Sequence, residues 1–107
     1  MTGPARELAL LMQQLELVLQ AFEQKSGATR AALAIHDDSP PSTTAHPDVR
    51  VEPNVDAAAR GTAIDSIRRL LAEFEHETGF RVIDVETMPT TRYASGRYLR
   101  PFIQPVD

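Results

Sequence analysis

The 107-residue sequence predicts an α+β fold in which two amphipathic helices pack on one face of a small, mostly antiparallel sheet of three or four strands. Three observations predict this fold. Two long stretches repeat apolar residues at helical spacing, short stretches alternate apolar and polar residues, and glycine or proline separates them. The expected order is α-β-β-α-β, to which a final edge strand can be added. We treat residues 1–107 as one domain, since a chain of this length can bury a core without a disulfide or a metal.

The first predicted helix has Thr2 as its cap and Pro4 in its opening turn, and it runs to about Lys25 before a glycine stop at Gly27. Its main apolar face repeats every three or four residues and consists of Leu8, Leu11, Leu15, Val18 and Phe22. Leu10 and Leu17 point to nearly the opposite side of the helix. They are covered by another segment, used by a partner, or simply exposed, as single leucines often are.

Two short strands are expected next. Residues 31–36 form the first, with Leu33 and Ile35 facing inward, and residues 49–52 form the second, with Val49 and Val51 inward. Between them, residues 37–47 are rich in proline, hydroxyl and carboxylate side chains and offer nothing to bury, so we expect a mobile loop. We detect no internal repeat in the sequence.

The second helix carries an apolar face at the same spacing, formed by Ile64, Ile67, Leu71, Phe74 and Thr78. Thr62 followed by Asp65 resembles a capping box, and Gly79 occupies the position of a left-handed stop. Residues 55–60 are either a separate helical turn or a continuation of this helix with a weak point at Gly61, and we favour the continuation.

A third strand follows this helix at once. Ile83, Val85 and Thr87 alternate with Val82, Asp84 and Glu86, which predicts a first set facing the core and a second set facing largely water. Proline cannot donate to a ladder, so Pro89 ends the strand. The last edge strand would use Leu99, Phe102 and Ile103, and Pro101 and Pro105 exclude a central position for it.

Composition excludes several classes of protein. The absence of cysteine excludes disulfide frameworks and thiolate metal sites, and it fits a cytoplasmic protein. The net charge of −4 argues against a general polyanion binder. Polar residues interrupt the leucine-rich N-terminal stretch, so we expect neither a signal peptide nor a membrane span. Ten arginines against one lysine are typical of a GC-rich coding genome, which favours a bacterial or phage source.

Two groups of titratable residues are candidates for catalytic or metal sites. The loop region brings together five possible ligands, His36, Asp37, Asp38, His46 and Asp48. Imidazole with carboxylate suits zinc, manganese or iron, but the spacing matches no known motif, so we predict no metal and no cofactor. The second group, Glu73, Glu75, His76 and Glu77, lies on the polar side of the second helix and is expected to be solvated.

The segment 89–107 is the one basic part of an acidic chain and combines arginine with aromatic residues, namely Arg92, Tyr93, Arg97, Tyr98, Arg100 and Phe102. This composition is typical of protein interfaces and of single-stranded nucleic-acid sites. Three arginines would release few counterions, so nucleic acid is the less favoured partner. The segment is either an edge strand with solubilising arginines or an extended arm.

The sequence contains no phosphate-binding glycine loop, nucleophile elbow or zinc-protease motif, so we predict that the chain is not an enzyme. The favoured hypothesis is a non-catalytic protein–protein interaction module, acting as a homodimer or as an adaptor, inhibitor or immunity-type partner. Its predicted contact residues are Leu10, Leu17, Arg92, Tyr93, Arg97, Tyr98 and Arg100. The alternatives are a small metal-dependent enzyme using residues 36–48 and a weak nucleic-acid-binding regulator using the basic segment.

Overall fold

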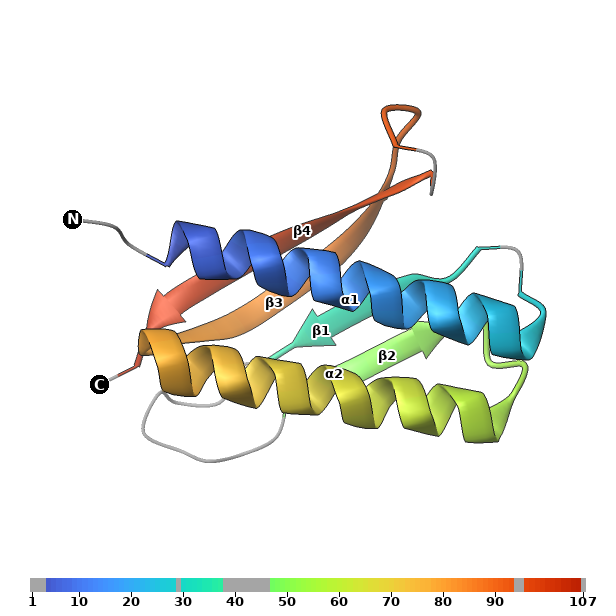
Figure 1. Ribbon diagram of the computed structural model, residues 1–107, viewed down its shortest axis with the longest axis horizontal. Helices are drawn as coiled ribbons and strands as arrows, with labels where there is room; N and C mark the ends of the chain where they lie inside the picture. Colours follow the sequence, from blue (N-terminus) through green and yellow to red (C-terminus); the bar gives the residue numbers. More distant parts are fainter. Residues whose placement is uncertain (1–3, 29, 38–46, 94–95, 107) are drawn as a thin grey trace.

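The computed structural model describes residues 4–28, 30–37, 47–93 and 96–106. Its elements are α1 (Ala5–Ser26), β1 (Ala32–His36), β2 (Asp48–Glu52), α2 (Ala57–Thr78), β3 (Phe80–Pro89) and β4 (Arg97–Pro105). The two helices lie side by side on one face of a four-stranded antiparallel sheet with the order β2-β1-β3-β4 (Figure 1). The predicted α+β fold is confirmed, and the C-terminal segment adds the edge strand β4.

Helix α1 buries the apolar face that its sequence predicts. Its buried residues are Leu11, Leu15, Leu19 and Phe22, while Leu8, Met12 and Val18 pack at the margin of the core. Pro4 is the N-cap residue and makes no side-chain capping bond, and the predicted cap Thr2 lies outside the described residues. The predicted stop at Gly27 is confirmed, because this glycine is left-handed with a φ of 76°.

Helix α2 begins earlier than the Thr62 capping box indicated. Asp56 is the cap and accepts a hydrogen bond from the Ala59 N–H at 3.1 Å, whereas the Thr62 hydroxyl donates to the Ala58 carbonyl inside the helix. The helix is continuous through Gly61, as favoured above, because the stronger aspartate cap lies six residues upstream of Thr62. Within the described residues, neither α1 nor α2 is long and apolar enough to cross a membrane.

The core lies between the helix layer and the sheet. Leu33 and Ile35 of β1 and Val49 and Val51 of β2 all face it, as predicted, and the two strands pair with Leu33 opposite Val51. From α2, the residues that face the core are Ala59, Ala63, Ile67, Leu71 and Phe74. The helical spacing of the sequence therefore identified most of the buried face, although it missed the two alanines in the first turns.

Strand β3 departs from the predicted alternation. A bulge between Val82 and Asp84 inserts Ile83 as an extra residue, so Val82 and Val85 are both buried. The assignment of Val82 to the water-facing set is thus wrong, because a bulge shifts the side-chain phase by one. Beyond the bulge, the Thr87 hydroxyl bonds to both the N–H and the carbonyl of Leu33, each at 2.7 Å, and extends the contact between β1 and β3.

The architecture repeats one unit, a helix followed by two antiparallel strands. Each helix has 22 residues, and the first strands of the two units, β1 and β3, pair antiparallel at the centre of the sheet. The two helices also contact each other, and they lie side by side over the sheet (Figure 1). This arrangement is that of two copies related by an approximate two-fold axis, although no repeat was detected in the sequence.

The ends of the two helices are alike in detail. In α1 the Ser26 hydroxyl donates to the Phe22 carbonyl, and in α2 the Thr78 hydroxyl donates to the Phe74 carbonyl, both at 2.7 Å. Each hydroxyl then accepts a hydrogen bond from the backbone N–H two residues later. The sequence likeness is confined to these short segments, Phe-Glu followed by a hydroxyl residue and glycine, which explains why sequence inspection missed the repeat.

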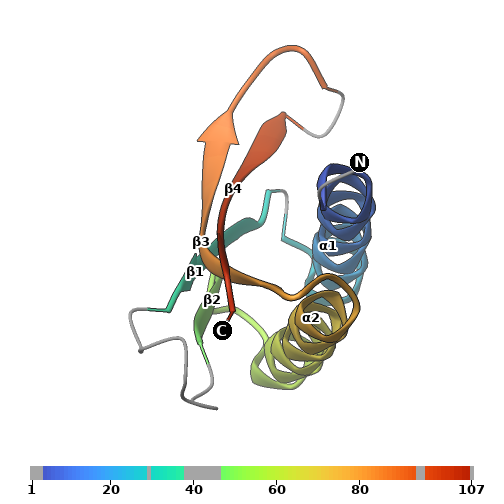
Figure 2. The same ribbon diagram turned by 90° about the vertical axis from the view of Figure 1, so that its left-hand side faces the viewer.

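The second unit has the longer strands. β3 and β4 contain 10 and 9 residues, against 5 in each of β1 and β2. Figure 2 shows that the hairpin of β3 and β4 continues beyond the helix layer, while β1 and β2 end beneath it. Among the described residues, the extended end of this hairpin is therefore the part of the second unit that has no counterpart in the first.

Candidate interaction surface

Two exposed leucines mark the outer side of α1. The side chains of Leu10 and Leu17 are 54% and 60% exposed, and they lie two helical turns apart. Both positions follow from the helical phase of the sequence, since the core-facing residues of α1 occupy the other side. No described segment covers Leu10 or Leu17, so of the three alternatives given above, contact with a partner and simple exposure remain.

The projecting hairpin carries two exposed tyrosines near its tip. Tyr93 and Tyr98 are 53% and 45% exposed, and their rings stack with centroids 6.3 Å apart and an interplanar angle of 24°. The turn is closed by the Thr90 N–H, which donates to the Gly96 carbonyl, and by the Gly96 N–H, which donates to the Tyr93 carbonyl, both at 3.0 Å. Gly96 has a φ of 77°, a conformation that fixes this turn and favours glycine.

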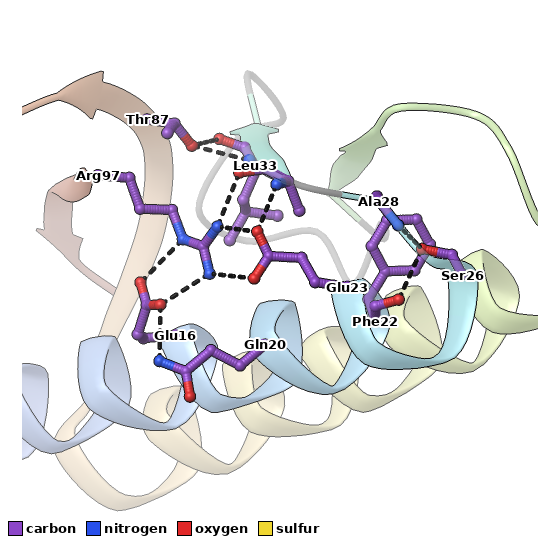
Figure 3. Close-up of polar contacts among 10 residues, drawn as sticks. Glu16, Gln20, Phe22, Glu23, Ser26, Ala28, Leu33, Thr87 and Arg97 are labelled. Atoms are coloured by element: carbon purple, nitrogen blue, oxygen red, sulfur yellow. Dashed lines mark hydrogen bonds and ion pairs between the residues drawn. The ribbon is translucent and has the colours of Figure 1, made fainter. Parts of the chain in front are cut away.

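Arg97, a predicted contact residue, lies in the interior. Its guanidinium donates to both carboxylate oxygens of Glu16, from Nε at 2.9 Å and from Nη2 at 2.7 Å. It also donates to both oxygens of Glu23, from Nη1 at 2.6 Å and from Nη2 at 3.3 Å, and to the Ala31 carbonyl at 3.0 Å (Figure 3). Only 2% of Arg97 is exposed, so it cannot serve as a partner contact and we withdraw it from that set.

The arginine network ties the base of the hairpin to α1. Glu23 also accepts the Ala31 N–H at 2.6 Å, and Glu16 accepts a hydrogen bond from the Gln20 amide at 3.0 Å (Figure 3). Glu16 and Glu23 are two turns apart on one side of the helix, which is the sequence signal that could have indicated a shared cation. That signal was missed because the register that turns Arg97 toward α1 depends on the pairing of β3 with β4.

The ionised forms of Glu23 and Arg97 are each stabilised by their partners in the network. Burial of the Glu23 carboxyl raises its pKa, but the hydrogen bonds from Arg97 and from the Ala31 N–H, together with the charges of Arg97 and Arg30, lower it by more. The pKa of Glu23 therefore lies below its ordinary value. Burial lowers the pKa of Arg97, while the hydrogen bonds and charges of Glu23 and Glu16 raise it to a net value above the ordinary one. Both groups are thus ionised at neutral pH.

A groove separates the N-terminal half of α1 from the hairpin. Its volume is about 1140 Å³, and its lining is mostly apolar. Leu10, Met12 and Leu99 contribute to this lining, and so do Tyr93 and Tyr98 from the hairpin. The exposed leucine of α1 and the exposed tyrosines, which are far apart in the sequence, therefore belong to one hollow.

A second, smaller hollow of about 530 Å³ lies at the hairpin tip. It shares Tyr93 and Tyr98 with the groove, and it adds Arg92 and Arg100. The guanidinium carbon of Arg100 lies 4.9 Å from the centroid of the Phe102 ring, a cation–π arrangement that holds this side chain in place. The fold thus brings together every predicted contact residue of the basic segment except Arg97.

The candidate metal and catalytic residues do not converge in the part of the chain that is described. His36 and Asp48 are opposite each other on β1 and β2, and both are exposed, while Asp38 and His46 lie outside the described residues. Among the residues with described positions, no group of three His, Cys, Asp or Glu could hold a metal ion. On α2, Glu73 and Glu77 are exposed, and Glu75 binds Arg81 with a distance of 2.7 Å.

A comparison of the chain with protein-family models, with curated proteins and with solved structures finds no match. The functional conclusion therefore depends on the geometry of the surface.

Proposed function

We propose that this chain is a non-catalytic protein–protein interaction module that acts as a homodimer through the outer side of α1. The observation that carries the proposal is that Leu10, Tyr93 and Tyr98, all about half exposed, line one groove. Large apolar and tyrosine side chains gathered in one exposed hollow are typical of protein contact sites. An adaptor, inhibitor or immunity-type role would use the same surface toward a different protein.

The geometry of α1 favours a second copy as the occupant. On a two-fold axis the same patch is used twice, so that Leu10 of one copy faces Leu17 of the other in an antiparallel helix pair. Gln13 and Gln14 lie between the two leucines and are exposed, so the centre of such a contact contains no like charges. The neighbouring tyrosines then add apolar area at the rim.

The energetics set the expected strength of the dimer. Burial of a leucine is worth about 1.5–3 kcal/mol relative to exposure, and the two-fold contact removes four leucines from water. The loss of translational and rotational freedom costs roughly 4–15 kcal/mol, which leaves a weak to moderate net affinity. We therefore expect a dissociation constant no tighter than the micromolar range, which corresponds to about 8 kcal/mol.

Side chains, and not strand edges, are expected to hold the partner. Pro101 and Pro105 lie on the edge strand β4 and donate no hydrogen bond. On the other edge strand, β2, the Val51 carbonyl accepts a hydrogen bond from Arg60 Nε at 2.9 Å. Each edge therefore lacks part of the hydrogen-bonding ladder that an added strand would need.

Light scattering over a range of concentrations, together with circular dichroism, tests the proposal. The wild type should dimerise at micromolar concentration, and the Leu10→Glu, Leu17→Glu double variant should be a folded monomer. Val55→Glu is the matched control, because Val55 is as exposed as Leu17 but lies in the segment before α2 and outside the groove. A wild type that stays monomeric at high concentration contradicts the dimer.

A further inference from the structure

The hollow at the hairpin tip combines aromatic faces with positive charge. Six of its lining residues are Met88, Thr90, Arg92, Tyr93, Tyr98 and Arg100. Met88 and Tyr98 are register partners on β3 and β4, and both are partly exposed. The stacked Tyr93 and Tyr98 also line the groove beside α1, so the two hollows share one aromatic pair.

The two arginines of this hollow are free to bind an anion. Within the described part of the chain, neither Arg92 nor Arg100 forms an ion pair with a carboxylate. Glu86 is opposite Arg100 in the strand register, yet no ion pair joins them. Arg97 differs, because Glu16 and Glu23 neutralise it inside the fold. The tip therefore presents two uncompensated positive charges on a chain whose net charge is −4.

We infer that the hairpin tip binds an acidic segment of a partner protein, in which a carboxylate lies next to an apolar side chain. The guanidinium groups of Arg92 and Arg100 would donate to the carboxylate, since arginine and carboxylate form charge-assisted, often bidentate hydrogen bonds. The apolar neighbour would lie against Tyr93, Tyr98 and Met88. Stacking on Phe102 already orders Arg100, so less side-chain freedom is lost on binding.

The charge of the tip makes single-stranded nucleic acid the weaker candidate. Stacked tyrosines with arginines resemble a base-binding platform. With Arg97 neutralised internally, however, the lining of the hollow offers only Arg92 and Arg100 to phosphates, with Arg30 beside Gly96 in the same turn as a third cation nearby. Each neutralised phosphate adds only one unit of counterion release. The net negative charge of the chain also opposes a polyanion. An acidic peptide needs only one or two carboxylate contacts, which matches the charges that are present.

The inference rests on the proposed role of the chain as an interaction module, but it does not require the dimer. The test is a selection of random linear peptides displayed on phage, followed by fluorescence anisotropy with the selected peptide. Selected sequences should carry Asp or Glu beside an apolar residue. The Arg92→Gln, Arg100→Gln double variant should bind the selected peptide about tenfold more weakly, as should wild type toward a peptide with Asn or Gln in place of its acids.

The matched control is the Arg68→Gln, Arg69→Gln double variant, which removes the same charge from two exposed positions of α2 and should bind like wild type. Selection of neutral or basic peptides, no selected binder, or equal binding to both double variants overturns the inference. So does tighter binding of single-stranded oligothymidine than of the selected peptide. Repeating the titration on the Leu10→Glu, Leu17→Glu variant separates the two proposals, because the tip should bind there even if the dimer is absent.

Discussion

The two helix–strand–strand units of the molecule share a core and differ in their hairpins. Both helices end at a left-handed glycine and bury a phenylalanine one turn earlier. The strands of the first unit stop beneath the helices, whereas those of the second continue past them and carry Tyr93 and Tyr98. The shared features are those that stabilise the fold, and the candidate surface is built on the feature that only one unit has. The expected effects of substitution follow this division.

The largest expected effect concerns the two equivalent phenylalanines. Phe22 is 2% exposed and Phe74 is 4% exposed, and both belong to the central core. Phe22→Ala and Phe74→Ala should each lower the free energy of unfolding by about 3–5 kcal/mol, because each leaves a cavity. Chemical denaturation measures both. A loss below about 1 kcal/mol for either variant contradicts the equivalence of the two cores.

The second-largest expected effect concerns the ion pairs, in which the two units differ. Arg97 of the second unit joins Glu23 of the first, whereas Arg81 joins Glu75, the counterpart of Glu23, within the second unit and also interacts electrostatically with Asp37 of the first. Arg97→Ala leaves two partly buried carboxylates without their cation and should cost about 3–5 kcal/mol. Arg81→Ala should cost less at Glu75, because the Glu75 side chain is 37% exposed and water can replace its partner, although the variant also removes a cation that acts on the buried Asp37.

Arg97→Lys is the control for charge, since it keeps the cation but loses the planar fork that binds two carboxylates. In denaturant titrations, the free energy of unfolding of Arg97→Lys should lie between those of Arg97→Ala and wild type. Equal stability of Arg97→Ala and wild type contradicts a structural role for the network. Such a result would return Arg97 to the candidate contact residues.

A smaller effect concerns acid stability. The folded pKa of Glu23 is lowered, so this carboxylate contributes stability that is fully present above its unfolded pKa of about 4.3 and is lost as the pH falls through the folded value. Glu23→Gln should flatten the dependence of unfolding free energy on pH below that unfolded value. In an Arg97→Met background the same substitution should change the slope much less. An identical slope in Glu23→Gln and wild type contradicts the linkage.

The smallest expected effect comes from a substitution in α2 that introduces the residue found at the equivalent position of α1. Gly61 lies within α2 and is exposed, a Cβ added to it would meet only open space, and its counterpart in α1 is Ala9. Gly61→Ala should therefore raise the free energy of unfolding by about 0.5–1 kcal/mol, because alanine loses less backbone entropy in a helix. Thermal unfolding followed by circular dichroism measures the gain. Gly79→Ala, at a φ of 74°, should do the opposite and provides the control.

Patterns within single elements could be predicted from the sequence, and pairings between elements could not. The spacing of Leu11, Leu15 and Phe22 established the buried side of α1, and it left Leu10 and Leu17 outside, as observed. The cap of α2 was assigned to Thr62, although the favoured continuation of the helix through residues 55–60 is observed, because Asp56 and Thr62 can both cap a helix and propensity alone did not choose between them.

The candidate surface was predicted in part for the same reason. Tyr93 in the turn and Tyr98 at the start of β4 are exposed at the hairpin tip, where composition is informative. The position of Arg97, in contrast, depends on which way β4 turns its alternate side chains. The bulge near Ile83 sets the phase of β3 and is invisible in an apolar and polar pattern. The sequence pattern alone therefore placed Arg97 on the surface, although its guanidinium belongs to an interior network of ion pairs.

The approximate two-fold axis bears on how the fold is held together. Two separate helix–strand–strand chains would have to find each other, and such an assembly would come apart on dilution. Here residues 53–56 join β2 to α2, so the helix contact and the pairing of β1 with β3 form at the effective concentration that a short tether imposes. The contacts between the two units have the geometry of a dimer interface, but they form within one chain. Their stability therefore does not depend on the protein concentration.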